Sequence, residues 1–195
     1  MAWTPPITLR RLILVTGDLH RTDWYQGGQS KPPVAVPDDL AFRWLRTSTD
    51  TPLPSQYATQ AEALLRIDRG DACLCGFRVG NPLPIYHLWV TEAAAELPRV
   101  FGAVRARPGE LLVYDAWVDR AFRGGRAHVV GAAFACEEAL RRSRRVIVAG
   151  VARHEVAGYR RTYHAAGIGD IEHTRNIYAL KLFRRTWHWE RAVRA

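Results

Sequence analysis

Short runs of apolar residues recur along the chain and predict strands. Several of them are rich in Val, Ile, Leu and aromatic residues, and Gly, Pro, Asn or Asp stands at many of their ends, which is typical of buried or half-buried strands. The runs cover residues 7–15, 40–45, 72–79, 85–91, 111–118, 146–151 and 176–183. Gly80-Asn81-Pro82 separates two of the runs, so we expect those two to form an antiparallel hairpin.

Three other stretches carry helix-forming residues or apolar residues at helical spacing. They cover residues 56–69, 126–142 and 154–166. In the second stretch Val129, Ala133, Cys136 and Leu140 fall on one helical face. Glycine follows the first and third stretches, where it commonly ends a helix. Residues 92–109 read as a less regular insertion, and residues 186–195 as helix or loop.

The order of these elements after residue 55 predicts a mixed α/β layer fold. Its first half is antiparallel, and residues 111–151 form a parallel strand–helix–strand unit. We expect a single domain: a core over residues 55–195, and an N-terminal extension of strand and loop over residues 1–54 packed on it.

Length and composition indicate a globular protein. The chain has 195 residues, of which 48% are hydrophobic and 24% charged. No apolar run reaches the roughly 18 residues of a membrane helix, and residues 12–15 are too few for a secretory signal. We therefore expect a cytoplasmic protein without membrane contact. Three cysteines in such a chain suggest neither a disulfide framework nor a metal site.

The net charge of +9 comes almost entirely from arginine, since Lys31 and Lys181 are the only lysines. This usage fits two explanations. One is the base composition of the genome. The other is an anionic partner: the phosphates of a cofactor, an acidic protein or a nucleic acid. Charge alone does not choose between them.

The segment Arg123-Gly124-Gly125-Arg126-Ala127 lies between a predicted strand and a predicted helix. Glycines at such a turn let backbone N–H groups approach a phosphate, and the helix N-terminus and the two arginines add positive charge. The segment predicts a pyrophosphate site. The alternative is a tight turn with solvated arginines.

Residues 118–168 resemble the acyl-CoA-binding core of the GNAT N-acetyltransferase superfamily. The resemblance rests on the turn at residues 123–127 after the strand ending at Val118, and on Tyr163, Gly167 and Ile168 at the family's Tyr-x-x-x-Gly-Phe. With the hairpin at residues 72–91, it extends over residues 55–183. It implies a mostly antiparallel, splayed mixed sheet flanked by helices.

The resemblance also implies a cofactor, acetyl-CoA or another acyl-CoA, and its contacts. The pyrophosphate would lie on the backbone of residues 123–127, and the pantetheine between the strand ending at Val118 and the strand at 146–151. Backbone N–H groups near Trp117 and Val118 would polarise the thioester carbonyl. Tyr159 would also contact the cofactor.

Two residues are candidates for proton transfer. Tyr163 would protonate the departing thiolate, because a phenol is a neutral donor at pH 7. Asp115, an acid in an apolar strand, would be the base for the acceptor amine, directly or through water. Each also has a purely structural interpretation: Tyr163 as a core aromatic residue, and Asp115 as the partner of an arginine. His87 is a weaker candidate for the base.

The favoured function is transfer of an acyl group, with acetyl as the expected group, from acyl-CoA to a primary amine of an unknown acceptor. An acyl carrier protein is a further possible partner, and both monomer and homodimer stay open. The family's usual residues are missing at Phe122 and Val156, which leaves open a non-catalytic acyl-CoA-binding protein. The remaining alternative is a nucleic-acid-associated protein using the arginines at 141–145 and 160–161, although no recognised nucleic-acid module is present.

Overall fold

The computed structural model describes residues 7–18, 34–47, 49–50, 60–97, 102–144, 146–151, 153–168, 171–182 and 185–193. The strands of the main sheet are β1 (Ile7–Asp18), β2 (Leu40–Leu45), β3 (Ala72–Arg78), β4 (Pro84–Thr91), β7 (Glu110–Val118), β8 (Val146–Val151), β9 (Ile171–Leu182) and β10 (Arg185–Ala192). A separate two-stranded ribbon contains β5 (Ala94–Leu97) and β6 (Gly102–Arg105). The helices are α1 (Gln60–Asp68), α2 (Ala127–Arg141) and α3 (Val156–Ala165), with short 3-10 turns η4 (Arg120–Phe122) and η5 (Arg153–Glu155).

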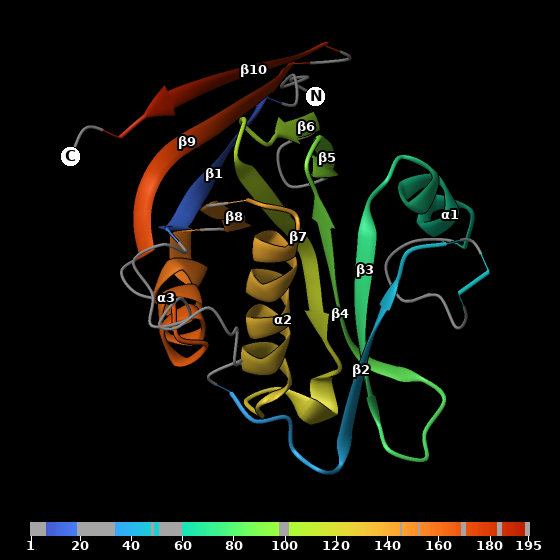
Figure 1. Ribbon diagram of the computed structural model, residues 1–195. Helices are drawn as coiled ribbons and strands as arrows, with labels where there is room; N and C mark the ends of the chain where they lie inside the picture. The colour runs from blue at the N-terminus through green and yellow to red at the C-terminus, as the bar shows by residue number, and fades with distance from the viewer. Residues whose placement is uncertain are drawn as a thin grey trace, which may run out of the picture.

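The main sheet has eight strands in the order β10-β9-β1-β8-β7-β4-β3-β2 (Figure 1). Of the strand pairs that the structure describes in it, β7 and β8 run parallel and the others antiparallel. The predicted mixed, mostly antiparallel sheet is therefore confirmed. The first strand, β1, lies inside the sheet, antiparallel to both β8 and β9.

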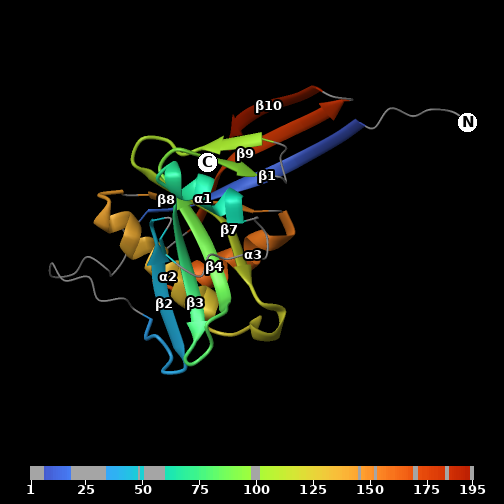
Figure 2. The ribbon, with the colours of Figure 1, turned by 90° about the vertical axis from the view of Figure 1, so that its right-hand side faces the viewer.

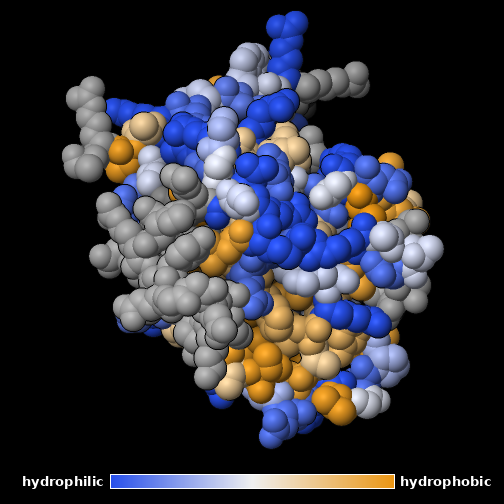
Figure 3. Space-filling view, in the orientation of Figure 1, coloured by the Kyte–Doolittle hydropathy of each residue, from blue (hydrophilic) through white to orange (hydrophobic). Residues whose placement is uncertain are grey.

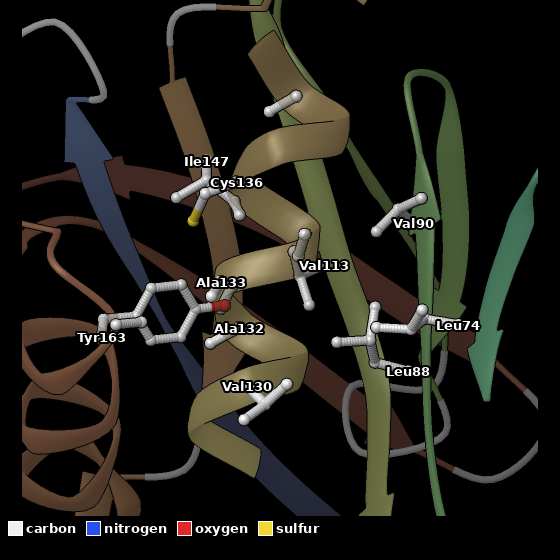
Figure 4. Close-up of a cluster of buried hydrophobic side chains, with 14 of the residues drawn as sticks. Leu74, Leu88, Val90, Val113, Val130, Ala132, Ala133, Cys136, Ile147 and Tyr163 are labelled. Carbon is white, nitrogen blue, oxygen red and sulfur yellow. The ribbon is translucent and has the colours of Figure 1, made fainter. Parts of the chain in front are cut away.

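Helices cover both faces of the sheet. Alternate strand residues point to opposite faces, and on both faces these side chains form apolar clusters that the helices bury. On β3, Leu74 packs with α2 and α3, whereas Cys73 and Cys75 pack with α1 on the other face. Figures 1 and 2 show α2 and α3 on one side of the sheet and α1 on the other. The core below α2 joins Val113 and Leu88 of the sheet to side chains of α2 and α3 (Figure 4).

Three predictions from the sequence need correction. Residues 92–109 contain the ribbon β5–β6, and the strand placed at 176–183 begins at Ile171. The tail contains β10 rather than helix or loop. Nearly every side chain of β10 is exposed, so no buried face marks the strand in the sequence. Residues 56–59 of the first predicted helix lie outside the described residues.

Candidate active site

The parallel strands β7 and β8 diverge in the middle of the sheet. Their pairing runs from Glu110 opposite Val146 to Val113 opposite Ala149. Beyond that point β7 continues to Val118 along β4, while β8 continues along β1. This is the splay that the resemblance implied, and it opens the ladder beside the second half of β7.

A bulge at Asp115 lies where the divergence begins. Tyr114 pairs with Trp89 and Trp117 with His87, so two residues of β7 oppose one residue of β4. Asp115 has a φ of 50°, a conformation that is uncommon outside glycine but tolerated by Asp. Bulges re-aim the residues that follow them.

The bulge leaves a backbone donor facing the gap in the ladder. The Asp119 N–H donates to the Ile85 carbonyl of β4 at 2.8 Å. Peptide groups alternate in direction along a strand, so the Val118 N–H points away from β4, to the side from which β8 has diverged. An amide so placed can polarise a carbonyl group.

The turn after β7 has the features of an anion site. Gly124 has a φ of 80°, and a Cβ there would meet nothing within 4 Å, so the backbone is open to a ligand. Arg126, the N-cap of α2, makes no side-chain cap hydrogen bond. The first N–H groups of α2 are therefore available to a phosphate. Arg120, Arg123 and Arg126 are all exposed around this turn.

Apolar surface adjoins the turn. Val118, Phe122 and Val129 are partly buried and pack on the core cluster beneath α2. In Figure 3, which has the orientation of Figure 1, hydrophobic residues gather at the lower end of the face turned to the viewer, near the start of α2. A hydrophilic band lies above them. A ligand with a phosphate at the turn and an apolar arm along α2 would match this distribution.

The two tyrosines of α3 face the first half of α2. Tyr163 is 3% exposed and stacks on Tyr159, with ring centroids 5.7 Å apart. Figure 4 shows its hydroxyl reaching Ala132 and Ala133 of α2. Burial raises the pKa of Tyr163 well above its usual value, so the phenol is neutral at physiological pH. Tyr159 in turn makes an edge contact with His128 of α2 at 5.7 Å.

Two buried polar atoms beside the first turns of α2 find no hydrogen-bond partner among the described residues. They are the Tyr86 hydroxyl and His128 Nδ1, whose rings lie 5.8 Å apart. Gly131 lets α2 approach here, since a Cβ at that position would lie 2.3 Å from the Tyr86 ring. Buried polar groups are normally paired, so these two fit a site completed by a ligand.

Asp115 faces the α1 side of the sheet. Its Oδ2 accepts a hydrogen bond from Arg66 Nη1 at 2.8 Å, and Arg66 also donates to Glu62 at 2.8 Å. The Arg66 guanidinium lies over the adjacent rings of Trp89 and Tyr114, at 5.1 and 5.3 Å from their centroids. The arginine partner that the structural interpretation anticipated is present, and the base role of Asp115 stays a prediction.

His87 lies next to this ion pair on β4. It is 1% exposed and stacks on Trp117, with centroids 5.4 Å apart. Burial lowers the pKa of His87 to about 4, so its imidazole is neutral at pH 7. Trp117 therefore has its side chain on the α1 side and its backbone at the edge of the gap.

The structure thus brings the turn at 123–127, Val118 and the α3 tyrosines to one side of the sheet, and Asp115 and His87 to the other. Sequence reasoning missed three residues of this region: Arg66, Tyr86 and His128. Arg66 could have been found, because it shares the buried face of α1 with Ala63 and Ile67 at helical spacing.

Among the described residues no group of three or more His, Cys, Asp or Glu side chains is arranged to hold a metal ion. In the same part of the chain, no helix is both long and apolar enough to cross a membrane.

No protein-family model and no curated protein matches this sequence. Solved structures match it in fold. A GCN5-related N-acetyltransferase from Sphaerobacter thermophilus is 14% identical, with a TM-score of 0.53, over 100% of this chain and 54% of that one. A tandem GNAT protein from the clavulanic acid biosynthesis pathway is 16% identical, with a TM-score of 0.52, over 94% and 54%. A Drosophila protein is 14% identical, with a TM-score of 0.53, over 96% and 52%. This chain spans about half the length of each.

Proposed function

Because this chain adopts the fold of the GNAT N-acetyltransferases, we propose that it transfers an acyl group, with acetyl expected, from acyl-CoA to a primary amine. The observation that carries the proposal is the divergence of β7 from β8 after Val113, directly before the uncapped, glycine-containing turn that opens α2. A thioester arm needs the gap, and a pyrophosphate needs the turn.

The residues of the turn would hold the cofactor. Backbone N–H groups at 123–127 would bind its pyrophosphate, and the guanidinium groups of Arg123 and Arg126 would add charge-assisted hydrogen bonds. Trp117, Val118 and Tyr159 would flank the arm. When bound, acyl-CoA supplies an activated thioester carbonyl, and the Val118 N–H is the donor suited to polarise it.

The two side chains proposed for proton transfer, Tyr163 and Asp115, lie on opposite faces of the sheet. Tyr163 is the proposed acid for the leaving thiolate, supported by its neutral phenol. Asp115 is the proposed base, so the acceptor amine would approach from the α1 side. Its ion pair with Arg66 would hold the carboxylate in one orientation at the bulge.

The same exposed arginines at the turn suit an acyl carrier protein as an alternative donor, because such a partner presents acidic groups. A titration with acetyl-CoA, with acyl-CoAs of increasing chain length and with an acylated carrier protein separates these donors. Thermal shift reports binding directly, since a ligand of the native state raises the melting temperature.

The decisive variant is Arg123→Ala with Arg126→Ala. Each lost charged hydrogen bond is worth about 1.5–3 kcal/mol, which weakens the Kd for CoA roughly 10- to 150-fold per arginine. Arg160→Ala with Arg161→Ala is the matched control: it removes the same charge from exposed positions on α3, and CoA affinity should hold. Equal affinity for CoA in both double variants would mean that the phosphates bind elsewhere.

Turnover is then tested with acetyl-CoA and a panel of primary amines, following release of free CoA thiol. Acyl-CoA binding without turnover of any amine would favour the non-catalytic alternative. If nucleic acid binds and acyl-CoA does not, the proposed function is wrong.

A further inference from the structure

The strand β10 ends the sheet, and of the features that usually protect an edge it carries charged side chains (Arg185, Glu190 and Arg191) but no proline, lysine or bulge. Its register with β9 runs without a break from Arg185 opposite Leu182 to Ala192 opposite Arg175. It contains neither proline nor lysine, and most of its side chains are exposed. Edge strands normally carry prolines, lysines or bulges that block pairing with another chain. Figures 1 and 2 show β10 along the outer side of β9.

The opposite edge strand, β2, likewise contains neither proline nor lysine, but its apolar side chains are covered. On β2, Leu40, Phe42 and Trp44 pack against the core beneath α2. Trp187 and Trp189 of β10 are each 44% exposed. The two tryptophans alternate along the strand and therefore share one face of the sheet.

A stack of side chains spans β1, β9 and β10 and stops at this edge. Arg11 of β1 lies over the Tyr178 ring of β9 at 5.8 Å, and Tyr178 stacks on Trp189 of β10 with centroids 5.3 Å apart and planes 11° apart. One side of the Trp189 ring contacts Tyr178, so the other side faces out from the edge. The stack is thus open at the position where a further strand would add its next member.

We propose that a second copy of this chain pairs with β10 in antiparallel fashion, with the two Trp189 residues opposite each other on a two-fold axis. Strands in a sheet lie about 4.8 Å apart, close to the spacing of the existing stack. Trp189 would then stack on Trp189 of the partner subunit, and the row of Arg11, Tyr178 and Trp189 would continue symmetrically into the second sheet.

Charge selects this register over its neighbours. With Trp189 on the axis, Trp187 lies opposite the partner's Arg191, a cation–π pair, while Glu190 keeps its ion pairs with Arg107 and Arg175 within its own subunit. A register centred on His188 places Arg185 opposite the partner's Arg191, which is repulsive. A register centred on Trp187 pairs only residues 185–189, whereas the Trp189 register uses residues 186–192 of both copies.

The first test is the mass in solution. We expect the wild-type protein at twice 22.1 kDa by light scattering, and Trp189→Arg at 22.1 kDa, because two guanidinium groups would face each other on the axis. Leu83→Arg is the matched control: Leu83 is 67% exposed on the turn before β4, and this variant should stay dimeric. A wild-type protein that is monomeric at its highest soluble concentration overturns the proposal, and so does a dimeric Trp189→Arg variant.

The second test reads the register and needs no variant at Trp189. Thr186 lies opposite the partner's Ala192, so a mixture of the Thr186→Cys and Ala192→Cys proteins should form a disulfide-linked dimer on mild oxidation. Neither variant alone should form a disulfide-linked dimer. The native cysteines are all buried, which keeps the background low. Cross-linking of Thr186→Cys to itself overturns the register. Binding of a single-stranded oligonucleotide to a monomer, abolished by Trp189→Arg, would make the row a base-stacking surface instead.

Discussion

Replacing Asp115 by Asn separates the two roles assigned to this carboxylate. Asn keeps the shape of the side chain and tolerates the φ of 50°, so the bulge should survive. An amide cannot take a proton from an ammonium group, however, and it leaves the charge of Arg66 without its partner at 2.8 Å. Asp115→Asn therefore tests catalysis and stability in one protein.

The exposure of the pair sets the size of the stability effect. The Arg66 side chain is 7% exposed and that of Asp115 31%. Removing one partner of a fully buried pair costs about 3–5 kcal/mol. Arg66 keeps Glu62 as a second partner, so the loss should be nearer the value of one charged hydrogen bond, about 1.5–3 kcal/mol. For a chain of this length that lowers Tm by about 3–12 °C.

Thermal unfolding and acetyl-CoA turnover on the best amine are measured on the same samples. If Asp115 is the base, turnover falls about 10²- to 10⁴-fold while the Kd for CoA is unchanged. Glu62→Gln is the matched control, because it removes the other carboxylate on Arg66. Glu62 is 50% exposed, so its loss should cost less than about 1 kcal/mol and leave turnover intact.

Two outcomes would refute this reasoning. Full turnover with a lowered Tm would make Asp115 a structural ion-pair partner and move the base elsewhere, with His87 the next candidate. An unchanged Tm would show that the buried guanidinium does not depend on Asp115, contrary to the geometry of the pair.

Further predictions concern the same side of the sheet as α2. Tyr163→Phe should bind CoA normally but lose about 10²- to 10⁴-fold in turnover; unchanged turnover would make Tyr163 a core aromatic residue. Gly131→Val should lower the free energy of unfolding by at least about 1–3 kcal/mol, because its Cβ would lie 2.3 Å from Tyr86; a normal denaturant midpoint would contradict that close approach. Hydrogen bonds from arginines, Arg141 among them, outweigh burial and hold the pKa of Glu138 below its usual 4.5. The stabilisation that ionised Glu138 gives the folded state is therefore present above pH 4.5 and is lost as the pH falls below 4.5. Glu138→Gln should accordingly flatten the curve of Tm against pH below pH 4.5.

Local patterns predicted most elements well. The strands at 40–45 and 146–151 have the predicted bounds, and α2 differs by one residue at each end. These segments combine an apolar run or helical periodicity with glycine or proline nearby, so nearest neighbours in the chain suffice to define them. The ribbon β5–β6 and β10 were not predicted, because short or exposed strands lack the buried face that produces a recognisable apolar pattern in the sequence.

The candidate site also contains features that the sequence predicted and features that it did not. The turn at 123–127 was predictable, because glycine conformation and a helix N-terminus are properties of adjacent residues. The ion pair between Arg66 and Asp115 was not, since its partners are 49 positions apart. Nor was the meeting of Tyr86 with His128.

By itself, the sequence determined the three helices and most of the strands, the place of the glycine-containing turn at 123–127, and that the sheet is mixed. Tertiary structure alone decided that β1 lies between β8 and β9, that β7 and β8 separate after Val113, and that a row of stacked side chains ends in the open at β10. The physical reason is that hydrophobic burial is non-directional. Hydrophobic burial determines which face of each segment is buried. Which strands become neighbours in the sheet is determined by packing and hydrogen bonding between segments far apart in the chain.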